Sequence, residues 1–137
     1  MINGVVATKL QTLEEVLNEL RSLGIIDAAA LKQDWRTQRA VERSLQVLVE
    51  VAIDICQRLI ALLGQSPATT GTDAIERCVQ LGVLTDKPEY RQMVRFRNFI
   101  VHRYDRVDTA VLANVVNNQL PTFEQFRDEI LAYVQAN

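Results

Sequence analysis

Apolar residues recur at steps of three and four along almost the whole chain, and no stretch alternates as a half-buried strand would. This spacing predicts amphipathic helices, each with one face turned to a shared core. We therefore predict an all-α fold, an up-and-down bundle of four to five helices that forms one domain over residues 1–137.

The expected helices are separated by glycines and capping residues. The first covers about residues 8–23 and ends at Gly24. The second, about residues 31–63, is the longest and would span roughly 45 Å at 1.5 Å per residue. Residues 64–71 form the clearest loop, and a short helix over about residues 73–81 follows it, ended by Gly82.

Two further helical regions complete the chain. The fourth helix is expected from Pro88, in its first turn, to about Tyr104. The last region begins after Asp108, a predicted N-cap, and runs to the C-terminus. Pro121 is expected to kink or split it, with Thr122 capping the second part.

Composition favours a soluble globular protein, because 48% of the residues are hydrophobic and 23% are charged. No apolar run approaches the roughly 20 residues of a membrane span, and the first residues lack the features of a secretion signal, so we predict a cytoplasmic protein. Cys56 and Cys78 are predicted to be buried, reduced thiols. With these two distant cysteines and one histidine, His102, we expect no metal site and no cofactor.

Positive charge is concentrated in one segment of a chain whose net charge is −2. Residues 87–106 hold two acids, Glu89 and Asp105, against six basic residues: Lys87, Arg91, Arg95, Arg97, Arg103 and Arg106. Such a cluster either attracts phosphate groups or is an ordinary solvated helix face, and the charges alone do not decide between them.

The fourth helix carries the candidate chemistry. On a helical wheel at about 100° per residue, one stripe within about 40° holds Tyr90, Val94, Arg97, Val101 and Tyr104. Arg97 thus lies in an apolar and aromatic stripe, where its charge needs a partner. A second stripe, roughly 100° away, holds Arg91, Arg95, Asn98 and His102.

These residue types suit the cleavage of RNA. Arg97 can stabilise the charge that develops on a phosphate, and His102 can transfer a proton near neutral pH. Asn98, one turn before His102, can orient its imidazole. One histidine does not easily serve as both base and acid, but a symmetric dimer would supply a second copy.

The segment Arg97-Asn98-Phe99-Ile100-Val101-His102-Arg103-Tyr104 has the form Arg-x4-His-x-Tyr, with Asn directly after Arg. This form resembles the motif of HepT toxins in the HEPN superfamily. Residues 40–46 and 52–54 also resemble that family's long second helix, and the length and helical layout fit over nearly the whole chain.

The resemblance implies a fold, an activity and a partner. HEPN toxins are metal-independent endoribonucleases that dimerise through the motif-bearing helices. Arg97 and His102 would take the catalytic positions, with Asn98 beside them, and the substrate would be tRNA or mRNA. HepT toxins pair with an MNT-type nucleotidyltransferase antitoxin, which would transfer AMP from ATP to Tyr104. A homodimer, or a larger hetero-oligomer with the antitoxin, is expected.

Residues outside the motif are expected to have supporting or structural roles. Asp54 is expected either to pair with Arg97 or Arg58, tuning the site if it faces the cleft, or to form an ion pair on the helix surface. Arg91 and Arg95 are expected as supporting residues. Trp35 is expected to anchor packing at the start of the second helix.

Two alternatives to the toxin nuclease stay open at this point. The first is a non-catalytic helical partner that binds substrate for a minimal nucleotidyltransferase. The second is a helical dimerisation domain that carries the motif by chance, although an arginine in an apolar stripe argues against it.

Overall fold

The computed structural model describes residues 3–102 and 108–137, and within these residues all regular structure is helical. The helices are α1 (Gly4–Ser22), α2 (Ala28–Lys32), α3 (Trp35–Leu62), α4 (Gly71–Gln80), α5 (Pro88–His102), α6 (Thr109–Asn114), the π-helical turn η1 (Val115–Gln119) and α7 (Leu120–Ala136). The predicted all-α bundle is confirmed.

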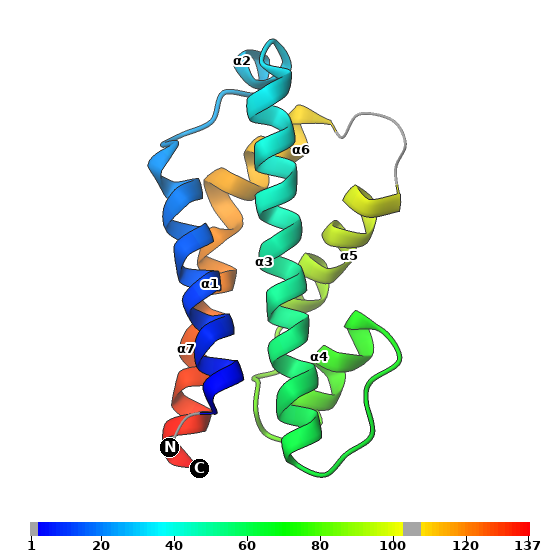
Figure 1. Ribbon diagram of the computed structural model, residues 1–137. Coiled ribbons are helices and arrows are strands. Elements are labelled where there is room, and N and C mark those ends of the chain that lie inside the picture. Colours follow the sequence, from blue (N-terminus) through cyan, green and yellow to red (C-terminus); the bar gives the residue numbers. More distant parts are fainter. Residues whose placement is uncertain (1–2, 103–107) are drawn as a thin grey trace.

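Helix α3 runs through the middle of the bundle (Figure 1). It packs against α1 on one side and against α4 and α5 on the other, while α7 lies beside α1. Helices α2 and α6 contact each other at the opposite end from the two chain termini. Ion pairs between Arg21 and Glu124 and between Arg127 and Glu14 also tie α1 to α7.

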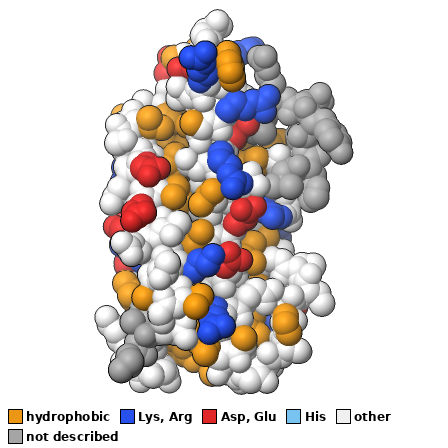
Figure 2. Space-filling model, in the orientation of Figure 1, with side chains coloured by type: hydrophobic (Ala, Val, Ile, Leu, Met, Phe, Trp, Pro, Cys, Tyr) orange, Lys and Arg blue, Asp and Glu red, His pale blue; other side chains and the backbone are white. Residues whose placement is uncertain are grey.

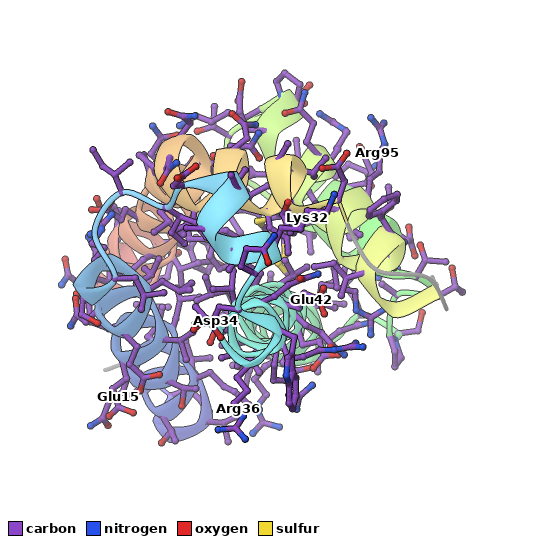
Figure 3. The ribbon with its side chains drawn as sticks, turned by 90° about the horizontal axis from the view of Figure 1, so that it is seen from above. Glu15, Lys32, Asp34, Arg36, Glu42 and Arg95 are labelled. Carbon is purple, nitrogen blue, oxygen red and sulfur yellow. The ribbon has the colours of Figure 1, made fainter. Side chains whose placement is uncertain are left out.

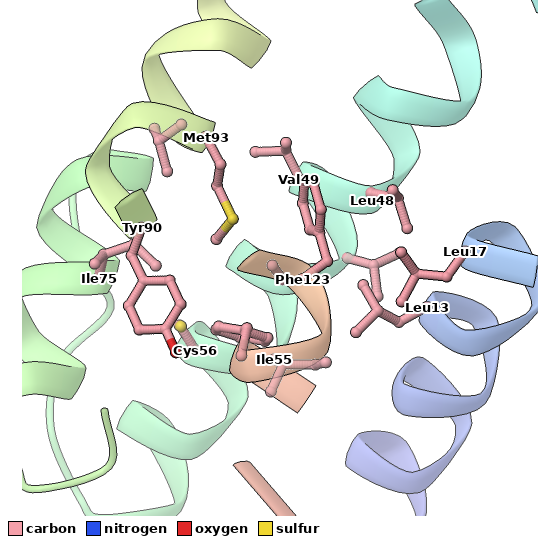
Figure 4. Close-up of a cluster of buried hydrophobic side chains, with 14 of the residues drawn as sticks. Leu13, Leu17, Leu48, Val49, Ile55, Cys56, Ile75, Tyr90, Met93 and Phe123 are labelled. Carbon is pink, nitrogen blue, oxygen red and sulfur yellow. The ribbon is translucent and has the colours of Figure 1, made fainter. Parts of the chain in front are cut away.

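The core forms where α3 meets its neighbours (Figure 4). The predicted stripe of α3 is buried from Val41 to Leu59, whereas Leu63, expected to continue it, is exposed beyond the end of the helix. Each large apolar side chain removed from water contributes about 1.5–3 kcal/mol before entropy is counted. The largest fully buried side chains on the other elements are Leu13, Leu17, Leu20, Ile75, Tyr90, Leu112, Phe123 and Phe126.

Helix α1 begins earlier than the hydrophobic pattern suggests. The Asn3 side chain accepts hydrogen bonds from the backbone N–H groups of Val5 and Val6, at 2.9 and 3.3 Å, and so caps the helix at Gly4. At the other end, Gly24 has a φ of 69°, a left-handed conformation that stops the helix as predicted.

The prediction of one continuous helix over residues 31–63 is wrong, because the structure has two helices there, α2 and α3. The chain leaves α2 at Gln33, and Asp34 starts α3 by accepting hydrogen bonds from the backbone and side chain of Thr37, at 3.1 and 2.6 Å. These bonds, from the Thr37 hydroxyl first, lower the pKa of the Asp34 carboxyl. Helix α3 is still the longest, with 28 residues.

The loop between α3 and α4 is held by a side chain of α3. Gln57 donates to the carbonyl of Ala68 at 3.0 Å and accepts from its N–H at 2.9 Å. Helix α4 begins at Gly71, slightly before the expected residue 73, because Thr70 accepts from the N–H of Asp73 and caps it. Helix α5 begins at Pro88 as predicted.

The last helical region is split near Pro121, as predicted, but by a π-helical turn rather than by a new cap. Asp108 caps α6 as expected, through a 2.8 Å bond from the N–H of Ala110. Thr122 does not cap α7, which follows η1 directly. In η1 the Asn117 side chain makes two hydrogen bonds to the backbone of Ile26, at 2.8 and 2.9 Å, and so fixes the link between α1 and α2.

Two expectations about single residues had different outcomes. Cys56 and Cys78 are buried, free thiols, as predicted, and the Cys78 thiol lies 3.7 Å from the carbonyl oxygen of Cys56. Trp35 is not a packing anchor, because 60% of its surface is exposed at the first turn of α3.

None of the described helices is long and apolar enough to cross a lipid bilayer.

Candidate functional site

Helix α5 holds Arg97 beside α3. Its first turns are fixed by Tyr90, a fully buried ring that packs edge-on against Phe126 at 5.9 Å and whose hydroxyl donates to Glu129 of α7. Val94 continues this buried face. Arg97 follows one turn later, where the face reaches the surface, and 29% of its side chain is exposed. The predicted stripe is therefore correct for these three residues.

The guanidinium of Arg97 is held by two side chains. One terminal nitrogen, Nη2, donates to Glu50 of α3 at 3.3 Å, and the other, Nη1, donates to the side-chain oxygen of Asn98 at 3.2 Å. The Nε atom is buried, and among the described residues it has no hydrogen-bond partner. Since a buried donor without a partner is costly, this nitrogen is where an added acceptor would gain most.

Glu50 contacts Arg97 but was not predicted from the sequence as part of the site. Its Oε1 atom also accepts from Gln46, one turn earlier on α3, at 3.0 Å, and its Oε2 atom lies 3.9 Å from the guanidinium of Arg43. Glu50 therefore links arginines from two helices. A signal was available, because Gln46 and Glu50 are four residues apart and share one face of a helix.

Of the two expectations for Asp54, the ion pair on the helix surface is correct, and the pairing with Arg97 or Arg58 is not. Its carboxylate lies 3.2 Å from the ammonium of Lys9 on α1, and its side chain is 54% exposed. It is placed one turn beyond Glu50, on the side of α3 that faces α1. The acid of α3 that meets Arg97 is therefore Glu50 and not Asp54.

Arg91 and Arg95 lie away from the Arg97 guanidinium. Arg91 pairs with Glu76 of α4 and with Asp86, 2.6 Å away, and these acids, Glu76 foremost, raise the pKa of its guanidinium. Arg95 is exposed, and Figure 3 shows it projecting on the opposite side of the bundle from Arg36 of α3. We conclude that Arg91 holds α4 against α5.

Acids from other elements neutralise much of the basic cluster predicted for residues 87–106. Lys87 lies 3.7 Å from Glu129, Arg91 is bound by two carboxylates, and Arg97 faces Glu50. The local excess of positive charge seen in the sequence is therefore smaller in the folded chain than a count of residues 87–106 indicates.

The remaining motif residues lie at the end of α5. Asn98 is exposed and its oxygen is bound to Arg97; His102 is the last residue of the helix, one turn further on. The side chain of His102, and Tyr104 as a whole, lie outside the described residues. Among the described residues no three His, Cys, Asp or Glu side chains are grouped to hold a metal ion.

This arrangement suits the binding of an anion. A guanidinium that is one-third exposed, and that is held in place by a carboxylate and an amide oxygen, can donate its remaining N–H groups to a phosphate group. The buried Nε atom and the two terminal nitrogens together offer a planar set of donors that matches phosphate oxygens.

Comparisons with known proteins find similar chains over nearly the whole length. The chain is 26% identical over 133 residues to "mRNA nuclease HepT" of Shewanella oneidensis, covering 96% of this chain and 99% of the relative. It is 23% identical over 134 residues to "tRNA nuclease HepT" of Aphanizomenon flos-aquae, covering 95% of this chain and 90% of the relative.

Solved structures resemble the fold over the same length. A tri-AMPylated HEPN toxin of Shewanella oneidensis in complex with an MNT antitoxin superposes with a TM-score of 0.84, at 27% identity, over 96% of this chain and 99% of the toxin. A toxin–antitoxin complex with AMP-PNP gives a TM-score of 0.82, at 26% identity, over 96% of this chain and 99% of the matched one.

Residues 13–130 match the protein family described as Ribonuclease HepT-like. That range includes α3 and α5 entirely, and hence Glu50, Arg97 and the whole motif that ends at Tyr104. The chain belongs to the Ribonuclease HepT-like family.

Proposed function

We propose that this protein is the toxin of a toxin–antitoxin pair and cleaves RNA without a metal, with Arg97 and His102 as its catalytic residues. The observation that supports this most directly is the partly exposed guanidinium of Arg97, held between Glu50 and Asn98. Its buried Nε atom has no partner within residues 3–102 and 108–137. The similar proteins named mRNA nuclease HepT and tRNA nuclease HepT support the choice of RNA as substrate.

The reaction follows from the chemistry of RNA. The 2′-oxygen attacks the adjacent phosphorus, the bond from phosphorus to the 5′-oxygen breaks, and the products are a 2′,3′-cyclic phosphate and a 5′-hydroxyl. His102 takes the proton of the 2′-hydroxyl, and Arg97 stabilises the charge on the phosphate oxygens. A second His102 returns a proton to the leaving 5′-oxygen.

A homodimer in which the motif-bearing helices meet would supply that second histidine. Each chain has one histidine, so a site built from one chain lacks either the base or the acid. Two-fold dimers are the commonest oligomers of soluble proteins, and their symmetry places two copies of one helix face together. Asn98 would then position Arg97, to which it is bound, as well as His102.

The antitoxin in this proposal is an MNT-type nucleotidyltransferase that transfers AMP from ATP to Tyr104, within the cytoplasm. The phenol oxygen attacks the α-phosphorus of ATP, pyrophosphate leaves, and the phenol proton goes to solvent. The similar toxin of Shewanella oneidensis is tri-AMPylated and bound to an MNT antitoxin, which supports this proposal. Added phosphate charge near Arg97 would compete with RNA for the guanidinium.

The activity is tested with labelled single-stranded RNA in the presence of EDTA. We expect the unmodified protein to release products with 2′,3′-cyclic phosphate ends. Arg97→Lys and His102→Ala should each reduce the rate at least about 100-fold, since each removes a group that acts in the transition state. Arg58→Gln, which changes an exposed arginine of α3 outside the site, serves as the control. Cleavage that persists in His102→Ala, or that requires Mg²⁺, contradicts the proposed mechanism.

The antitoxin relationship is tested by intact mass after coexpression with the nucleotidyltransferase. We expect mass increments of one or more AMP units that are absent from Tyr104→Phe and retained in Tyr133→Phe, a change in α7. An unmodified chain beside an active partner would contradict the modification. If such a chain also failed to cleave RNA, the protein would instead be a non-catalytic partner that binds substrate for the transferase.

A further inference from the structure

Helix α3 presents an exposed tryptophan and three arginines in its first two and a half turns. These residues, which we call the α3 stripe, are Trp35, Arg36, Arg39 and Arg43. Trp35 is 60% exposed, and the side chains of Arg39 and Arg43 are 67% and 65% exposed. The α3 stripe therefore places a flat aromatic ring next to a line of positive charges, a combination that suits nucleic acids.

The α3 stripe leads to the site described above. On a wheel of about 100° per residue, its four residues fall within an arc of about 100°, and Glu50 lies inside the same arc. At 1.5 Å per residue, Trp35 and Glu50 are about 22 Å apart along the helix axis. Figure 2 shows basic side chains following one another over the upper half of α3, and Figure 3 shows Arg36 pointing away from the bundle.

The arginines of the α3 stripe are available to a ligand. Within the described part of the chain, Arg39 and Arg43 make loose ion pairs, 3.7 Å from Glu42 and 3.9 Å from Glu50, of the kind that contributes little in water. Glu42 is turned inward, where Gln38 donates to it at 3.3 Å. Arg36 lies over the Trp35 ring at 5.4 Å. Glu42 is thus mostly covered, Glu50 is about one-third exposed, and the side chains of Arg39 and Arg43 face solvent.

From these observations we propose that the α3 stripe binds single-stranded RNA and directs it to Arg97. A base stacks on the face of the Trp35 ring opposite the one that Arg36 covers, and phosphates contact Arg39 and Arg43 on the way to Arg97. Stacking on an aromatic ring combined with a line of basic groups is how proteins hold single strands with little preference for sequence. The inference rests on the proposed RNA cleavage, and it adds where the strand lies.

A single strand fits this surface better than the other ligands of negative charge. A duplex hides the faces of its bases, so it would leave Trp35 without a stacking partner. An acidic protein would satisfy the arginines but gives no reason for an exposed indole ring beside them. We therefore assign the α3 stripe to RNA and treat a protein ligand as an outcome of the test.

The test uses the only tryptophan of the chain as its reporter. A single-stranded oligouridylate is titrated into the full-length His102→Ala protein, which keeps the RNA intact. We expect the fluorescence of Trp35 to be quenched on binding. In the same background, followed by fluorescence anisotropy of labelled RNA, Trp35→Ala should weaken binding about fivefold or more. Arg39→Gln with Arg43→Gln should reduce the slope of log K against log[salt] by about 1.4, about 0.7 for each lost phosphate contact.

Two control variants lie on the same helix outside the α3 stripe. Leu62→Ala removes an exposed apolar side chain and Arg58→Gln an exposed arginine, and both should bind RNA as the parent does. Thermal unfolding of every variant checks that it folds. The assignment is overturned if RNA binds without quenching Trp35, or if Trp35→Ala and the double arginine variant bind like the controls. It is also overturned if these variants lose the nucleotidyltransferase partner while RNA binding is unchanged.

The outcomes for this surface and for the proposed function are distinguishable. If the parent protein with His102 cleaves RNA while the stripe variants bind normally, only the assignment of the α3 stripe fails. If the strand quenches Trp35 and the arginine variants weaken binding, but no RNA is cleaved, the proposed cleavage fails and the RNA-binding surface stands.

Discussion

Arg97 of α5 and Glu50 of α3 form an ion pair at 3.3 Å across the contact between the two helices. Both side chains are about one-third exposed, so the pair contributes at most about 1 kcal/mol to folding. Its larger effect is on geometry, because Glu50 fixes one prong of the guanidinium while Asn98 fixes the other. In this arrangement Glu50 is a positioning residue.

Glu50→Ala should therefore lower the rate of RNA cleavage more than it lowers stability. Without the carboxylate the guanidinium is free to rotate, and we expect kcat to fall about tenfold with a small change in KM, an effect of orientation. Glu50→Gln keeps an oxygen acceptor for Nη2 and should restore most of the rate. Equal losses of kcat in both variants would show that the charge of Glu50, rather than its hold on Arg97, is what matters.

Arg91→Gln should lower stability and leave cleavage nearly unchanged. Arg91 joins α5 to Glu76 of α4 and to Asp86, so its loss leaves two acids close together without their cation. We expect the midpoint of thermal unfolding to fall by a few degrees, with kcat within about twofold of the parent. Lys32→Gln, an exposed cation of α2, is the control for the loss of one charge. A loss of activity without a loss of stability would place Arg91 in the site after all.

Tyr90→Phe should destabilise the protein by about 1–2 kcal/mol, measured by urea unfolding. The ring is fully buried and remains so, but the hydroxyl no longer donates to Glu129. Glu129 keeps the 2.7 Å hydrogen bond from the N–H of Thr85 and its ion pair with Lys87. The expected loss of unfolding free energy is therefore small for a hydrogen bond to a charged acceptor. Tyr133→Phe is the matched control. An unchanged unfolding free energy in Tyr90→Phe would mean that this hydrogen bond adds nothing to stability.

Acid should remove the contribution of Asp34 to stability. Hydrogen bonds from Thr37 hold the pKa of this carboxyl below its usual 3.8, so the charged form favours the folded state. The contribution is complete above the usual pKa and is lost as the pH falls through the lower folded value. Asp34→Ala should thus be clearly less stable than the parent at about pH 7, and the difference should narrow at about pH 3.

Glu15→Ala controls for the loss of a carboxylate, because Glu15 is exposed on α1 and projects away from the bundle (Figure 3). Its difference from the parent should be small at both pH values. A difference between Asp34→Ala and the parent that stays constant from neutral to acid pH would contradict the role of the Asp34 charge.

Much of the fold could be predicted because the hydrophobic spacing is regular where helices are long. The stripe from Val41 to Leu59, the stop at Gly24 and the start at Pro88 were all predicted correctly. The helix ends that were predicted wrongly depend on hydrogen bonds from polar side chains. Asn3 and Asp34 cap helices through bonds that the apolar pattern does not contain, although Asp34 with Thr37 has a readable capping spacing.

The site was harder to predict, because a sequence gives the face of a helix and not the partner across from it. The wheel placed Arg97 on the right face, yet whether Glu50 or Asp54 meets it depends on the relative placement of α3 and α5. Trp35 could have been placed, since it lies about 110° from the centre of the buried stripe of α3. The prediction that Trp35 is buried rested on the size of its side chain and was wrong. The roles of His102 and Tyr104 stay predictions.

Helix α3 contributes three surfaces at once: the face buried against α1, the carboxylate that meets Arg97, and the exposed stripe that begins at Trp35. The angles between these surfaces around the helix axis depend only on the number of residues that separate them. Inserting or deleting one residue between Arg43 and Glu50 would rotate one end of the helix by about 100° relative to the other, and no repacking of side chains could restore the alignment. Related chains should accordingly tolerate substitutions along this segment, but they should keep its length.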